Sequence, residues 1–127
     1  MCLRTGIEEV EKRVKKLHKV FPVWKVMYSS SQLYRTEFDD NKTHLLVDGI
    51  NVAAYYQEKR SWIPYQPGFH AFLRLKDAKS MFPYDKKRVR KFWAKKEWII
   101  TCGYDAVNNL PCVVLSKIST SKEAIHN

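Results

Sequence analysis

Positive charge in this sequence is concentrated in residues 86–96, a segment with seven lysines and arginines and no acidic residue. Like charges this close repel one another, and a bound polyanion would relieve the repulsion. Phe92 and Trp93 add rings on which bases can stack, an interaction worth ~1–3 kcal/mol per base. The segment therefore predicts contact with phosphate groups or nucleic acid. The residues expected to make it are Lys87, Arg88, Arg90, Lys91 and Trp93.

A second interpretation of the same segment needs no ligand. If residues 88–93 form an edge strand, Val89 and Trp93 face the core, and the arginines only keep the edge from pairing with other chains. The sequence has no zinc-finger spacing, RNP signature or Walker loop that would favour the nucleic-acid interpretation.

His70 is the other residue that could do chemistry, and it lies among aromatic residues in Gly68–Phe72. A histidine in an apolar strand is most often a hydrogen-bonded core residue. The near-neutral pKa of histidine would also suit ligand contact or proton transfer at a site open to solvent. If Lys25, His70 and the arginines of the basic segment converge on one concave face, they form a ligand pocket.

Three cysteines, Cys2, Cys102 and Cys112, are an odd number at no metal-ligand spacing. They predict neither a disulfide framework nor a zinc site. Cys102 and Cys112 are expected to be small buried residues. No cofactor and no metal are expected.

The composition predicts one globular domain over residues 1–127. Apolar residues make up 45% of the 127 residues, and the net charge is +10. Without the basic segment, 16 basic residues remain against 13 acidic ones, so the charge is a local feature. No apolar run reaches the ~18 residues of a membrane span, and the first residues lack the apolar stretch of a signal peptide. We expect a protein of the cytoplasm with no membrane partner.

The elements that would position these residues begin with a helix. Thr5 and Glu8 have the spacing of a capping box, and apolar residues then recur every three or four positions as far as Phe21. Pro22 is expected to end this helix.

Strands follow the helix. Residues 23–28 and 33–38 alternate with period two, and residues 45–47 before Asp48-Gly49 predict a third strand and a turn. Residues 50–56 fit either a strand or a short helix.

The second half of the chain continues the pattern. Residues 68–72 predict a buried strand, residues 75–82 a helix, and residues 98–101 and 113–118 two further strands. Residues 119–127 are polar and are expected to fray. The fold class is α+β: an N-terminal helix packed on a mainly antiparallel, twisted sheet, with one or two short helices.

Several stretches carry a resemblance to a loosely defined group of small uncharacterised phage and bacterial proteins. They are Met1-Cys2-Leu3, Val23-Trp24-Lys25-Val26, Gly68–Phe72 and the Asp77-Ala78 pair. The resemblance implies a phage or prophage accessory protein acting in the bacterial host cell, a class that includes inhibitors of host defence.

The order of motifs is also faintly similar to the ADP-ribosyltransferase fold. The similarity sets Lys25 on an early strand, Phe69–Phe72 on an aromatic strand before a helix, and Glu97 at the late catalytic glutamate. Lys25 stands where the family has arginine or histidine, and no Ser-Thr-Ser follows it. The similarity implies, as an alternative, an enzyme acting on NAD through Lys25, His70 and Glu97.

The leading hypothesis is a non-enzymatic inhibitor of host defence. Through a basic edge it would bind a nucleotide signal, nucleic acid or an acidic protein surface. The predicted phosphate- or nucleotide-binding residues are Lys25, His70, Lys87, Arg88, Arg90, Lys91 and Trp93. A third interpretation, inhibition of a host protein alone, adds the Trp62–Tyr65 loop as an interface.

Overall fold

The computed structural model describes residues 3–28, 35–36, 48–53, 68–81, 89–105 and 109–126. Their elements, in chain order, are β1 (Leu3–Thr5), α1 (Glu8–Lys15), β2 (Val20–Tyr28), β3 (Arg35–Thr36), β4 (Ile50–Val52), β5 (Phe69–Phe72), α2 (Leu75–Met81), β6 (Val89–Lys95), the 3₁₀ turn η2 (Lys96–Trp98), β7 (Ile99–Asp105), β8 (Pro111–Leu115), β9 (Lys117–Ser119) and α3 (Lys122–His126).

The strands of the described residues form one sheet in the order β1-β7-β8-β5-β2-β6-β9-β4, with β3 paired to β2 off this path. Every pairing recorded among them is antiparallel. Together with the short helices, this confirms the prediction of a mixed α and β fold built on a mainly antiparallel sheet.

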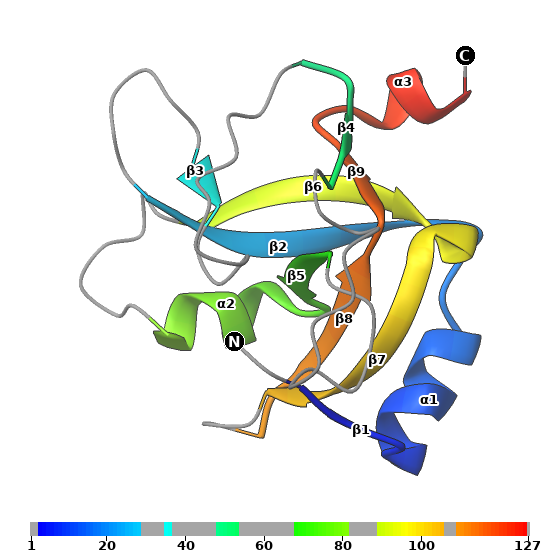
Figure 1. Ribbon diagram of the computed structural model, residues 1–127, viewed down its shortest axis with the longest axis vertical. Coiled ribbons are helices and arrows are strands. Elements are labelled where there is room, and N and C mark those ends of the chain that lie inside the picture. The colour runs from blue at the N-terminus through cyan, green and yellow to red at the C-terminus, as the bar shows by residue number, and fades with distance from the viewer. Residues whose placement is uncertain are drawn as a thin grey trace.

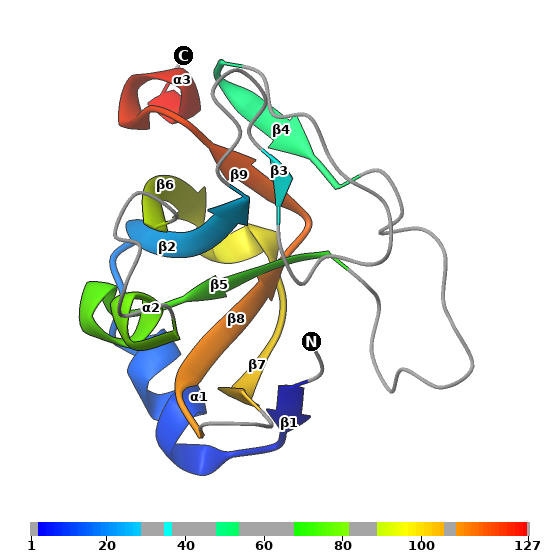
Figure 2. The same ribbon diagram turned by 90° about the vertical axis from the view of Figure 1, so that its left-hand side faces the viewer.

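The sheet curls back on itself. β8 pairs with β5, while β9 pairs with β6 on the far side of β2, yet only Ser116 separates β8 from β9 in the chain. Figure 1 shows β2 and β6 crossing the middle of the molecule, and Figure 2 shows the chain bending from β8 into β9 beside them. The curl gives the sheet an inner and an outer face.

Two apolar clusters fill these faces. The larger cluster takes alternate residues of the central strands, including Phe21 and Val23 of β2 and Phe92 of β6, together with Val10 of α1 and Ile125 of α3. The smaller cluster lies on the other face, where Ala78 of α2 packs with Val26 and Phe72 among others. The alternation follows from the two-residue period of a strand.

The first helix is shorter than the pattern predicts. α1 begins after Ile7, which makes no side-chain cap hydrogen bond, and ends at Lys15, so the capping box of Thr5 and Glu8 is not formed. Thr5 instead belongs to β1, opposite Gly103 of β7. Val20, Phe21 and Pro22 lie in β2 because their pairing with β6 outweighs the local helical spacing.

The part of the basic segment that forms β6 is not an edge strand of the sheet. β6 pairs with β2 from Val89 to Lys95, and its Trp93 pairs with Ser119 of β9 on the other side. β6 therefore has a neighbour on both sides, unlike the edge strand of the second interpretation, because β9 returns along the curled sheet and pairs with it at Trp93. Lys86, Lys87 and Arg88 lie outside the described residues.

Several local predictions correspond to elements of the structure. The period-two stretch at 23–28 falls within β2, residues 68–72 contain β5, and the helix expected at 75–82 corresponds to α2. Residues 50–56 fitted either a strand or a short helix, and residues 50–52 form a strand. The strand predicted at 45–47 lies outside the described residues. Where a frayed tail was expected, residues 122–126 form α3, because Ile125 is buried in the larger cluster.

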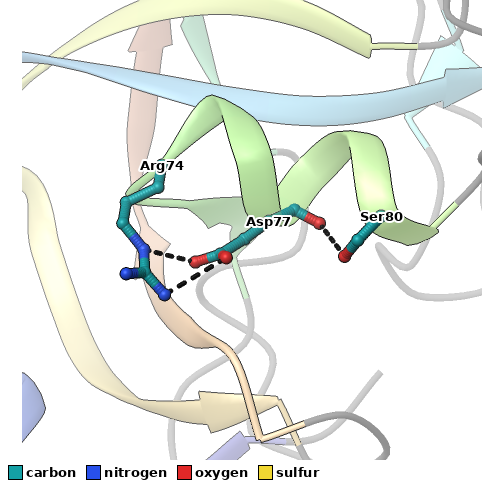
Figure 3. A network of polar contacts seen from close by, with 3 residues as sticks. All are labelled: Arg74, Asp77 and Ser80. Carbon is teal, nitrogen blue, oxygen red and sulfur yellow. Dashed lines mark hydrogen bonds and ion pairs between the residues drawn. The ribbon is translucent and has the colours of Figure 1, made fainter.

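Helix α2 is fastened at its start by a polar network. Arg74 donates to both carboxylate oxygens of Asp77 at 2.7 and 3.2 Å, and Ser80 donates to the Asp77 carbonyl at 2.7 Å (Figure 3). Asp77 is buried, so its charge is compensated where water is scarce. The Asp77-Ala78 pair thus has a structural role: one residue anchors the helix, and the other packs against the sheet.

Candidate functional site

Strand β6 divides the basic segment between two faces. Phe92 and Ala94 are fully buried and point into the larger cluster, so Arg90 lies on the same inner face. Lys91, Trp93 and Lys95 alternate with them and lie on the outer face, where Trp93 is half-buried and still packs against the larger cluster at its rim. The basic residues of β6 therefore lie in two different environments.

Lys25 lies on the inner face, opposite Arg90 in the pairing of β2 with β6. It is only 1% exposed, and its Nζ donates to the His70 carbonyl at 2.6 Å. The same Nζ lies 5.7 Å from the centre of the Phe69 ring. Arg90, for its part, lies 5.4 Å from the Phe92 ring. Lys25 is thus bound to the fold itself and does not face solvent.

His70 shares a backbone contact with Lys25 but not a side-chain site. It pairs with Val114, which belongs to the smaller cluster, whereas its neighbours Phe69 and Ala71 belong to the larger one. Its side chain therefore lies on the face opposite Lys25 and Arg90. Lys25, His70 and Arg90 therefore do not converge on one face, which was the condition for a shared ligand pocket, and Arg88 lies outside the described residues.

Trp93 is the centre of the outer face. Its ring is half-buried, and two ammonium groups lie over it: Lys91 Nζ at 4.5 Å and Lys122 Nζ at 5.2 Å from the ring centre. Lys122 comes from α3, which packs beside β6. Each such cation–π contact is worth about 0.5–1 kcal/mol at an exposed site. The contacts hold two exposed cations close to one aromatic ring.

A second pair of lysines lies next to this one. Lys95 of β6 and Lys117 of β9 each place Nζ 5.9 Å from the ring centre of Trp98, which is itself buried. Glu97 approaches Lys95 at 3.5 Å. Because the Trp98 ring is covered, it positions these two lysines and does not offer a stacking surface. We call the set Lys91, Trp93, Lys95, Lys117 and Lys122 the outer basic face.

One cation of the segment has a structural task. The backbone amide of Lys96 donates to the Lys19 carbonyl at 3.0 Å, and its Nζ donates to the Lys15 carbonyl at 2.8 Å. Lys15 is the last residue of α1, so the ammonium lies at the negative end of the helix. Lys96 therefore ties α1 to the end of β6.

Sequence reasoning identified part of this face and missed the rest. Lys91 and Trp93 were predicted and lie together, while Lys87 and Arg88 lie outside the described residues. Lys95 lies in the basic segment but was not among the predicted binding residues, and Lys117 and Lys122 lie outside the segment and were missed. Nothing in their local sequence marks them, because they reach the face only through the pairing of β9 and the packing of α3.

The residues of the enzyme alternative are not brought together. Lys25 is opposite Arg90, and Glu97 lies beyond Lys95 at the other end of β6. Arg90 and Lys95 are five residues apart, which corresponds to roughly 17 Å along a strand. Glu97 is exposed and pairs with Lys95, so it shares no site with Lys25.

The two described cysteines are unsuited to nucleophilic chemistry. Burial raises the pKa of both thiols, and the Glu11 carboxylate raises the pKa of Cys102 further. Cys112 belongs to the smaller cluster and Cys102 packs against the larger one, so the two side chains lie on opposite faces of the sheet. Both are free thiols.

Two further features are absent from the described part of the chain, a metal-ligand cluster and a membrane-spanning helix. No group of three or more His, Cys, Asp or Glu side chains is placed there to hold a metal ion. None of the helices among these residues has the length and apolar character needed to cross a bilayer.

Comparison with known proteins does not assign the site. The chain matches no protein-family model, and searches of curated proteins and of solved structures give no significant match. The outer basic face is therefore the feature of the molecule from which a function can be inferred.

Proposed function

We propose that this protein is a non-enzymatic binding protein that holds a phosphate-bearing partner on its outer basic face. The observation that carries the proposal is the placement of Lys91 and Lys122 over the half-buried ring of Trp93. Lys95 and Lys117 extend the same surface beside it.

The charges on this face favour an anionic partner. Among the residues that the structure describes, Lys95 is the one lysine of this face with a carboxylate within ion-pair distance, Glu97 at 3.5 Å. Four ammonium groups held near two aromatic rings repel one another, and a phosphate-bearing chain would relieve that repulsion. Lysine ammonium groups bind phosphates as mobile point charges, so the face can follow a flexible ligand.

The burial of Lys25 argues for this surface over the inner one. Its ammonium donates to the His70 carbonyl inside the fold, whereas Lys91 and Lys122 are exposed. The separation of Lys25 from Glu97 gives the ADP-ribosyltransferase alternative no common site. The resemblance to phage proteins adds a role to the proposal, that of a phage accessory protein that binds its partner in the host cytoplasm and so inhibits host defence.

The test measures affinity for two polyanions, inorganic polyphosphate and a single-stranded oligonucleotide of about twelve nucleotides. Lys91→Ala combined with Lys122→Ala is compared with Lys12→Ala combined with Lys16→Ala, which removes the same charge from exposed positions on and just after α1. We expect the first pair to weaken binding of both probes and the second pair to leave it nearly unchanged.

Salt dependence provides an independent readout. A plot of log affinity for the single strand against log salt should fall, and losing two phosphate contacts should reduce its slope by about 1.4. If neither polyanion binds at low salt, or if both double variants weaken binding equally, the proposal is wrong.

A further inference from the structure

We infer that the partner of the outer basic face is single-stranded nucleic acid, lying along β6 with one base stacked on Trp93. This inference rests on the proposed function and specifies its ligand. Along β6, Lys91, Trp93 and Lys95 follow one another on the same side of the strand, and Trp93 stays partly exposed beside its contact with the larger cluster. Alternate residues of a strand are about 6.6 Å apart, so charge, ring and charge follow one another in a line.

A single strand offers the matching chemistry. Its backbone carries a phosphate at every nucleotide, and its unstacked bases can lie flat against an aromatic ring. The bases of a duplex are stacked on each other and present only their edges in the grooves. A ring flanked by cations therefore distinguishes a single strand from a duplex and from a polyanion without rings.

The cations over Trp93 do not prevent stacking. Each cation–π contact at an exposed site is worth about 0.5–1 kcal/mol, less than the ~1–3 kcal/mol of a base stacked on an aromatic side chain. When a base takes the ring, Lys91 and Lys122 remain beside it and can move to the phosphates on either side. A bound single strand thus replaces the cation–π contacts of Trp93 with base stacking on the ring and with phosphate contacts to the two lysines.

The second lysine pair extends the path of the bound nucleic acid past Trp93. Lys95 and Lys117 both lie over the covered ring of Trp98, near the end of β6. They provide a further phosphate position on the side of Trp93 away from Lys91. The bound segment therefore covers more than one nucleotide, and affinity should rise with length until this track is filled.

The face has no means of reading sequence among its described residues. All of its cations are lysines, whose compact ammonium lacks the rigid fork of donors with which arginine selects a base edge, and the face includes no Asn or Gln. Ser119, the partner of Trp93 in the sheet, is buried and donates its hydroxyl to the Ser121 carbonyl at 2.7 Å. We expect little preference among base sequences.

The experiment compares Trp93→Phe and Trp93→Ser with the unmodified protein, after circular dichroism has shown that each variant is folded. The probes are single-stranded oligonucleotides of increasing length, a duplex of the same sequence and inorganic polyphosphate. Losing one stacked base should reduce affinity for single strands about 5- to 150-fold in Trp93→Ser. Trp93→Phe should retain most of the affinity, because it keeps a ring, and polyphosphate affinity should change little in either variant.

These measurements distinguish failure of the single-strand inference from failure of the proposed polyanion-binding function. If polyphosphate binds through the lysines but single strands bind no better than the duplex, the inference fails and the proposed function stands. Equal losses of oligonucleotide and polyphosphate affinity in Trp93→Ser would also overturn the inference. If no polyanion binds, both fail.

Discussion

At the scale of single residues, the structure separates two kinds of lysine that composition treats alike. Lys25 is buried and donates to a main-chain carbonyl, whereas Lys91 is exposed and lies over an indole ring. The first contributes to the fold, and the second is available to a ligand. Burial and hydrogen bonding therefore decide which basic residues can carry the proposed function.

This distinction predicts that two lysine substitutions differ in their effect on the free energy of unfolding. Lys25→Ala removes a buried stem that lies near Phe69 and a donor to the His70 carbonyl, so it should reduce the free energy of unfolding by roughly 2–4 kcal/mol. Lys91→Ala should change that free energy by less than about 0.5 kcal/mol. Urea unfolding of both variants provides the measurement. A Lys25→Ala protein of unchanged stability with lost oligonucleotide affinity would instead assign Lys25 to the ligand site.

At the scale of elements, close backbone contacts limit how the sheet can vary. β1 lies so near β7 that a Cβ at Gly103 would fall 1.9 Å from the Arg4 carbonyl oxygen. The side chain of Arg4 also donates to Asn109, so the contact continues past the end of β7. The absence of a side chain at Gly103 is therefore what allows β1 to join the sheet.

Gly103→Ala should displace β1, because the contact is with backbone, which cannot move aside as a flexible side chain can. We expect a loss of about 1–3 kcal/mol in stability and faster hydrogen exchange at the β1 amides. The matched control is Gly6→Ala, where the added Cβ meets nothing within 4 Å and the cost of about 1 kcal/mol comes from the positive φ of 71°. Unchanged exchange in β1 of Gly103→Ala would contradict the close contact.

At the scale of the whole molecule, the net charge of +10 acts on both stability and binding. Repulsion among the cations opposes the compact state, and dissolved salt screens it. The same salt weakens attraction to a polyanion, because binding releases counterions from the nucleic acid. The free protein and the complex should therefore respond to salt in opposite directions.

We predict that the midpoint of thermal unfolding of the free protein rises as sodium chloride is added from low ionic strength, while oligonucleotide affinity falls. Calorimetry and fluorescence anisotropy on the same samples would check both parts. Sucrose, which carries no charge, should leave the affinity unchanged and serves as the control. A midpoint that falls with salt would mean that attractive ion pairs, such as Lys12 with Glu8, dominate the electrostatics of the fold.

The sequence by itself determined what depends on short-range periodicity and composition. Alternation predicted the strands now seen in β2 and β5, helical spacing predicted α2, and the concentration of charge indicated Lys91 and Trp93. The strand and helix predictions are confirmed because each depends on residues within one element, whose period is set by backbone geometry, whereas the role of Lys91 and Trp93 stays a prediction.

Only the tertiary structure decided which strand lies in the middle of the sheet and which face of it is enclosed. β9 returns and pairs with β6 at Trp93, so β6 is not an edge strand. The curl also places Lys25 inside, although its charge favours solvent. Lys117 and Lys122 join Trp93 for the same reason. Pairing between strands far apart in the chain leaves no local pattern, because it is set by the packing of the whole core.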